Sequence, residues 1–294
     1  GQFSDKIFGE YLQLNLYTAP RFTSVANEEA ALRALANKHF ELIIIMAGID
    51  KTTPVATSRS IKRLYPDIHQ LMLVNNNADL AHFRRVEAET RESIERVFVW
   101  NGSTKVFLAM AKYLEDKINL DVDTRLADTR VILVVEDSIK YYSRYLPLLY
   151  TEVMTQTQAI INEEPSNDEM GVILKMRVRP KVILVSTFEE AVDIIDRYRD
   201  NIIGVISDVR YPRGGVEDEN AGIELIRHVR AFDTHVPCLL QSHERENLRR
   251  AQETKANFIV KTSPTLSRDA ATIMHSASAI SAFVSTFLAP PEPL

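Results

Sequence analysis

Short runs of apolar residues, many of them β-branched, recur along the chain, and longer stretches with helical periodicity lie between them. The runs are continuous rather than alternating, as expected for parallel strands that are buried on both faces. The predicted strands are residues 42–46, 71–74, 97–100, 131–135, 182–185, 204–207, 238–240 and 259–260. Amphipathic stretches predict helices at 28–37, 105–118, 189–199 and 221–231. Strand and helix therefore alternate, which predicts α/β domains with parallel sheets.

An internal repeat indicates that the chain holds two copies of one α/β unit. Residues 7–18 echo residues 141–151, and each copy continues with an acidic-led helix and then a buried strand. The length of 294 residues suits two domains of roughly 100–200 residues each. The first copy begins inside its first helix, so either the sequence is trimmed or this copy lacks its first strand.

The polar segment 120–126 precedes a new strand, which predicts a domain boundary at about residue 125. We therefore expect one domain at 1–125 and a second at 126–288. An acidic, proline-containing stretch predicts an exposed insertion around 155–180 in the second domain. The proline-rich tail at 289–294 predicts the start of a linker.

Candidate chemistry gathers at the strand ends of the second copy. Glu136 and Asp137 directly follow one buried strand, Asp208 follows another, and Ser242 and Lys261 follow two more. Open α/β sheets bind their ligands at the carboxyl ends of the strands. Three neighbouring carboxylates repel one another unless a cation lies among them, and an all-oxygen site suits Mg²⁺. Taken singly, each of these residues is more often a solvated or core residue, so the prediction depends on their joint occurrence.

In this order, the acidic pair, the aspartate, the hydroxyl, the aromatic Phe258 and the lysine resemble the receiver domain of two-component response regulators. The resemblance covers residues 128–288 and, more weakly, most of the first copy. It implies two flavodoxin-like (βα)₅ domains, each a parallel five-stranded sheet with helices on both faces. The first-helix sequence Tyr141–Leu146 is similar to receivers fused ahead of phosphoenolpyruvate-synthase-like enzymes.

The resemblance also implies the role of each site residue. Asp208 would accept a phosphoryl group from a sensor histidine kinase or phosphotransfer protein, and Lys261 would pair with the phosphoryl oxygens. Ser242 would move to hydrogen-bond the phosphoryl group, and Phe258 would turn inward after it. The implied ligands of Mg²⁺ are Glu136, Asp137, Asp208 and the backbone carbonyl of Arg210.

The second copy departs from the family pattern in three ways, one of which is that Thr262 and not proline directly follows Lys261. The separation between Asp137 and Asp208 is longer than usual, which is consistent with the predicted insertion. His243 stands where the family usually has a small residue, so access to the phosphoryl group would be restricted. In the first copy, alignment puts Met46 at the position of Asp208, Asn75 at that of Ser242 and Trp100 at that of Lys261. We therefore expect residues 1–125 to form a degenerate receiver without a phosphorylation site.

Composition narrows the function further. The net charge of −5 supplies no basic excess for binding nucleic acid. One cysteine, Cys238, indicates a reducing compartment, and no apolar run is long enough to cross a membrane, so we expect a cytoplasmic protein. The predicted function is phosphorelay signalling that switches a surface for a homodimer or for a downstream output domain or enzyme.

Two other functions stay open at this point. One is a Mg²⁺-dependent phosphatase or related hydrolase with Asp208 as nucleophile. That chemistry usually places a second aspartate two residues later, where this chain has Arg210. The other is a scaffold that is never phosphorylated, for which the departure at His243 is the main support. In the receiver interpretation the chain is no enzyme, apart from Mg²⁺-dependent phosphorylation and dephosphorylation of its own Asp208.

Overall fold

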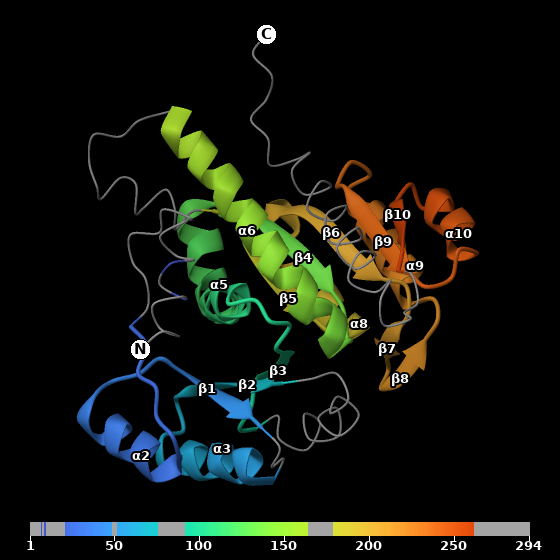
Figure 1. Ribbon diagram of the computed structural model, residues 1–294. Coiled ribbons are helices and arrows are strands. Elements are labelled where there is room, and N and C mark those ends of the chain that lie inside the picture. The colour runs from blue at the N-terminus through green and yellow to red at the C-terminus, as the bar shows by residue number, and fades with distance from the viewer. Residues whose placement is uncertain are drawn as a thin grey trace. The chain divides into compact units, whose positions relative to one another are not determined.

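The computed structural model describes residues 7, 9, 21–48, 52–75, 92–163 and 179–261. The chain forms two compact units, Gly1–Ala111 and Lys112–Leu294 (Figure 1). The division falls inside helix α5 (Lys105–Ala127), so the polar segment 120–126 is helical and belongs to the second unit. The predicted linker at 289–294 and most of the predicted insertion around 155–180 lie outside the described residues.

The first unit contains a parallel sheet whose strands follow one another in chain order. Its described strands are β1 (Leu42–Ala47), β2 (His69–Val74) and β3 (Arg96–Val99). They lie in the order β1-β2-β3, and both pairs are parallel. Its helices are α2 (Glu28–Asn37) and α3 (Thr52–Leu64). Helix α2 begins where the Asn27 side chain accepts a hydrogen bond from the Ala30 amide at 3.0 Å, which caps the first turn.

The second unit contains a five-stranded parallel sheet. Its strands are β4 (Val131–Val135), β5 (Lys181–Val185), β6 (Ile202–Asp208), β9 (Cys238–Ser242) and β10 (Asn257–Val260). Their order across the sheet is β10-β9-β6-β4-β5, and every neighbouring pair is parallel. This is the flavodoxin-like order, in which the direction of winding reverses between β4 and β6. The predicted α/β class with parallel sheets is confirmed.

Helices cover both faces of this sheet. They are α6 (Ile139–Glu163), α8 (Phe188–Arg197), α9 (Ala221–Phe232) and α10 (Asn247–Glu253), with a short 3₁₀ turn η2 (Arg199–Asn201). Alternate strand residues such as Leu133, Val205 and Leu240 pack against α8, α9 and α10 in one apolar core. Helix α6 lies across β4 and β5 in Figure 1, and the hydroxyl of its buried Tyr150 donates to the Val182 carbonyl of β5 at 3.2 Å.

A small antiparallel hairpin that we did not predict follows β6. Its strands are β7 (Tyr211–Arg213) and β8 (Val216–Asp218), and Gly214 and Gly215 form the turn with φ of +62° and +79°. Two successive positive φ angles are typical of the tight turns that match strand twist, and glycine adopts them without strain. The Gly214 amide donates to Glu189 at 2.8 Å, which ties the turn to helix α8.

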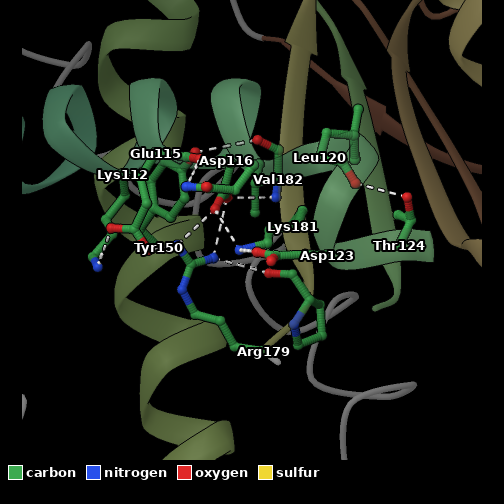
Figure 2. Close-up of polar contacts among 12 residues, drawn as sticks. Lys112, Glu115, Asp116, Leu120, Asp123, Thr124, Tyr150, Arg179, Lys181 and Val182 are labelled. Carbon is green, nitrogen blue, oxygen red and sulfur yellow. Dashed lines mark hydrogen bonds and ion pairs between the residues drawn. The ribbon is translucent and has the colours of Figure 1, made fainter. Parts of the chain in front are cut away.

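A buried network of charges fixes the second half of α5 to strand β5. The Asp116 carboxylate accepts from Arg179 Nη2 at 2.7 Å, from Arg179 Nη1 at 3.1 Å and from the Val182 amide at 2.8 Å (Figure 2). Lys181 lies 2.7 Å from Asp123 on the same helix. The side chains of Asp116, Arg179 and Lys181 are at most 1% exposed. Within the described residues, no helix is long and apolar enough to span a bilayer.

Candidate functional site

Three carboxylates meet at the carboxyl edge of the sheet, where β4 and β6 end side by side. Glu136 and Asp137 directly follow β4, and Asp208 is the last residue of β6. One oxygen of each lies within 4.8 Å of the others. The parallel pairing of β4 with β6 brings these residues together although more than seventy positions separate them in the chain. This group of carboxylates therefore lies at the carboxyl edge of the sheet, at the point where the direction of winding reverses.

Lys261 completes this group and directly follows the edge strand β10, which lies two places from β6 in the sheet. Its backbone amide donates to the Ser242 carbonyl at 2.6 Å, which extends the pairing of β10 with β9 by one residue. Its ammonium lies 2.5 Å from Glu136 Oε2 and 2.6 Å from Asp208 Oδ2, and its side chain is 1% exposed. The other Asp208 oxygen accepts from the Val209 amide at 2.7 Å. Both oxygens of Asp208 therefore have hydrogen-bond donors.

Burial and charge shift the pKa values of this group. Burial raises the pKa of Glu136 to about 8, Lys261 opposes that rise, and Asp208 and Asp137 add to it. Burial alone would lower the pKa of Lys261, but the carboxylates of Glu136 and Asp208 raise it above its usual range. Lys261 therefore stays protonated beside these carboxylates, and its single charge does not balance all three when they are ionised.

This donor set fits a hard divalent cation. Carboxylate oxygens are the ligands that Mg²⁺ and Ca²⁺ prefer, and Mg²⁺ usually takes only one or two of them together with water. In the part of the chain that the structure describes, Glu136, Asp137 and Asp208 are the acidic group suited to hold an ion. The predicted fourth ligand, the backbone carbonyl of Arg210, lies two residues beyond Asp208, and the Arg210 guanidinium pairs with Glu217 at 2.8 Å.

The hydroxyl of Ser242 faces the loop that leads into α10. It accepts from the Asn247 amide group at 2.9 Å and from the Glu244 backbone amide at 3.1 Å, so it caps the loop that leads into α10. Phe258 is partly buried and packs against the core on the face that α8, α9 and α10 cover. Ser242 and Phe258 lie two register positions apart on adjacent strands, so their side chains share this face of the sheet.

Tyr141 and His243 lie beside Lys261, and the sequence alone indicated only His243 as part of the site. Tyr141, at the start of α6, places its ring centroid 4.5 Å from the Lys261 ammonium. Its hydroxyl lies 2.9 Å from Nε2 of His243, which directly follows Ser242. Desolvation and the Lys261 charge lower the pKa of His243, although a hydrogen bond with the Lys261 backbone acts against them. A tyrosine near a helix start gives no sequence signal of such a partner.

The geometry of the site requires glycine at position 222, and the sequence alone did not indicate this requirement. Its amide donates to the Val209 carbonyl at 2.9 Å, so the first turn of α9 lies directly against the residue that follows Asp208. A β-carbon at this position would lie 2.1 Å from the Asp208 carbonyl oxygen and 2.9 Å from the Val209 α-carbon. Only glycine allows this approach of the helix to the end of β6.

Strand register defines the equivalent positions in the first unit. The Trp100 amide donates to the Val74 carbonyl at 2.7 Å, as Lys261 does to Ser242. Met46 pairs with the residue before Val74, as Asp208 pairs with the residue before Ser242. Met46 and Trp100 therefore occupy the expected positions, but Val74 rather than Asn75 stands at the position of Ser242. None of these three side chains is a carboxylate, a hydroxyl or an amine.

Comparisons with known proteins add little to this picture. No family model and no curated protein matches the chain. Among solved structures, a crystal structure of a GsuK mutant aligns with 93% of this chain and 60% of its own, at 12% sequence identity and a TM-score of 0.27. The chain thus spans less than two thirds of that structure, and a similarity this weak supports no conclusion about function.

Proposed function

We propose that the second unit is a phosphorylatable signalling receiver in which Asp208 accepts a phosphoryl group. The observation that carries this proposal is the position of the Lys261 ammonium, 2.5 Å from Glu136 and 2.6 Å from Asp208. A buried cation held between a nucleophilic carboxylate and an acidic pair suits phosphoryl transfer, because it neutralises charge that develops on the transferred oxygens. The phosphoryl donor would be a histidine kinase or a phosphotransfer protein.

The proposed transfer moves one phosphoryl group from the donor to the Asp208 carboxylate. One Asp208 oxygen attacks phosphorus in line, the bond between phosphorus and the donor nitrogen or oxygen breaks, and the donor leaves with the electron pair. Hydrolysis of the acyl phosphate later returns the Asp208 carboxylate and inorganic phosphate. Because both oxygens of Asp208 already accept hydrogen bonds, the Lys261 ammonium must exchange its contact with Oδ2 for a phosphoryl oxygen.

Mg²⁺ is the cation that we propose for Glu136, Asp137 and Asp208. When bound, it would supply positive charge beside the transferred phosphoryl group. Glu136 is fully buried and fixed by Lys261, so Asp137 and Asp208 are the more accessible ligands. The Arg210 carbonyl remains the proposed backbone ligand.

The downstream effect would run through Ser242 and Phe258. If Ser242 leaves Asn247 to bond the phosphoryl group, the loop into α10 loses the acceptor of two hydrogen bonds, and Phe258 on the same face can repack. We propose that this change alters a surface for a second copy of the chain or for an output partner. Met46 offers no oxygen to phosphorylate, so we propose a partner-binding role for the first unit.

Acetyl phosphate with Mg²⁺, followed by intact-mass measurement, tests this function. We expect a single phosphoryl adduct that requires Mg²⁺ and is lost in Asp208→Asn, whereas Asp200→Asn, which changes an exposed aspartate of the same unit, keeps it. Lys261→Ala should lower the rate by about 10²–10³, as expected for the loss of one preorganised charge. Steady release of phosphate without an adduct would instead identify a hydrolase. No adduct and no Mg²⁺ binding would leave a scaffold.

A further inference from the structure

The hydrogen bond between Tyr141 and His243 closes a bridge over the proposed phosphorylation site. Tyr141 belongs to the first turn of α6, and His243 belongs to the loop after β9, more than one hundred residues away in the chain. The two rings lie 5.5 Å apart between centroids. The bridge therefore joins two segments that flank the strand ends of β4 and β9.

The bridge limits the space around the Lys261 ammonium. Glu136 and Asp208 contact this ammonium at 2.5 and 2.6 Å, and the ring of Tyr141 lies 4.5 Å from it. His243 also hydrogen-bonds the Lys261 backbone. As a result the Lys261 side chain is 1% exposed and that of Asp208 is 15% exposed. A phosphoryl group that enters here needs the ammonium to release Asp208 Oδ2, and the Tyr141 ring lies against that ammonium.

We propose that Tyr141 and His243 form a gate that must open before a small phosphodonor reaches Asp208. The gate rests on the proposed function, because it concerns entry to the same carboxylate. His243 itself is exposed, and Tyr141 is half-buried, so their hydrogen bond breaks without disturbing the apolar core. The pair acts on access and not on the chemistry, since its hydrogen bonds join Tyr141 to His243 and His243 to the Lys261 backbone, not to Asp208.

The rate of phosphorylation by acetyl phosphate at saturating Mg²⁺ tests the gate. We expect Tyr141→Phe, which keeps the ring and removes only the hydroxyl, to raise this rate. We expect His243→Ala to raise it as well. The rise should lie between about twofold and tenfold, which is the net value of one hydrogen bond expressed as a rate factor. Time points are quenched and counted by intact mass.

The effects of the two substitutions on the rate should not add. If both act through one hydrogen bond, the double variant Tyr141→Phe/His243→Ala reacts no faster than the faster single variant. His243→Gln places an amide nitrogen at a similar reach to Nε2 and should restore a rate within about twofold of the wild type. Mg²⁺ affinity, measured by titration calorimetry, should stay unchanged in all of them, which a general loosening of the site would not allow.

His228 provides a matched control, because its Nε2 hydrogen-bonds Asp196 at 2.8 Å on the surface of the same unit. His228→Ala should leave the rate unchanged. The gate is refuted if Tyr141→Phe and His243→Ala react at the wild-type rate or more slowly, if their effects add, or if His228→Ala matches them. If the wild-type chain forms no adduct with Mg²⁺ and acetyl phosphate, the proposed function itself fails, which is a different result from an adduct that forms at equal rates in all variants.

Discussion

Replacement of Asp116 by alanine tests whether the buried charge network of Figure 2 holds the second unit together. The substitution removes the carboxylate that Arg179 contacts at 2.7 and 3.1 Å and that the Val182 amide contacts at 2.8 Å. The Arg179 guanidinium is then left with the Pro180 carbonyl at 3.0 Å and with Glu115 at 3.5 Å. A buried cation loses its main partner, and a buried amide loses its acceptor.

The expected loss in the free energy of unfolding follows from these contacts. Breaking a buried ion pair by removing one partner costs about 3–5 kcal/mol, and an orphaned buried N–H costs about 1–3 kcal/mol. The two costs overlap, because water that enters the vacated space can serve both donors, so we expect a loss of about 4 kcal/mol. For a domain of this size, roughly 2–4 °C per kcal/mol gives a melting temperature lower by about 8–16 °C.

Urea unfolding followed by far-UV circular dichroism measures this loss. Asp193→Ala is the matched control, because its pair with Arg197 at 3.2 Å is exposed and such pairs contribute about 0–1 kcal/mol. The double variant Asp116→Leu/Arg179→Met removes both charges and should recover much of the loss. A loss below about 1 kcal/mol in Asp116→Ala, or a double variant less stable than the single one, would refute the reasoning.

Two other predictions follow from buried contacts. Gly222→Ala puts a β-carbon 2.1 Å from the Asp208 carbonyl oxygen. We therefore expect the free energy of unfolding, measured in urea, to fall by about 1–3 kcal/mol and the reaction with acetyl phosphate to slow. An unchanged stability together with an unchanged rate would contradict this prediction. Burial raises the pKa of Cys238 to about 11, whereas an unfolded thiol titrates at about 8.5. The unfolded chain therefore loses this proton first, and the free energy of unfolding should fall between about pH 8.5 and 11. Cys238→Ser should flatten that slope, and at pH 8 the native thiol should react with a disulfide reagent only as fast as the protein opens.

Much of the site could be predicted because it depends on strand ends. A continuous apolar run predicts a buried parallel strand, and the residue after it must emerge at the carboxyl edge of the sheet. Glu136, Asp208 and Lys261 follow three such runs, and the structure brings them within hydrogen-bonding distance. That rule requires only the pattern of burial and not the positions of individual side chains.

Side-chain partners were not predictable in the same way. Whether the Ser242 hydroxyl faces Asp208 or Asn247 depends on which sheet face it occupies, and β9 is too short for its pattern to fix this. Tyr141 and His243 are over one hundred residues apart in the sequence, and only the fold brings them together. Asp116 and Arg179 are charged residues in polar stretches, for which a solvated surface is the usual expectation.

Two sequence features have a structural meaning that differs from the expectation or was absent from it. The dipeptide Gly214-Gly215 is a strong turn signal, and it marks the unpredicted hairpin of β7 and β8. The polarity of the segment 120–126 predicts a domain boundary. In the structure Asp123 of this segment pairs with the buried Lys181, so the polarity reflects an internal network rather than a linker.

The two units show that the backbone frame and the chemistry at its edge are specified separately. In both, the residue after the last strand donates its amide to the neighbouring strand at 2.6–2.7 Å, and Met46 and Asp208 hold the same register. Burial of the apolar runs on both faces of each sheet stabilises this pairing. The terminal side chain does not contribute to it, so it can be aspartate or methionine, lysine or tryptophan, without changing the sheet. A phosphoryl site therefore depends on a few edge residues, and the fold alone is no argument for function in the first unit.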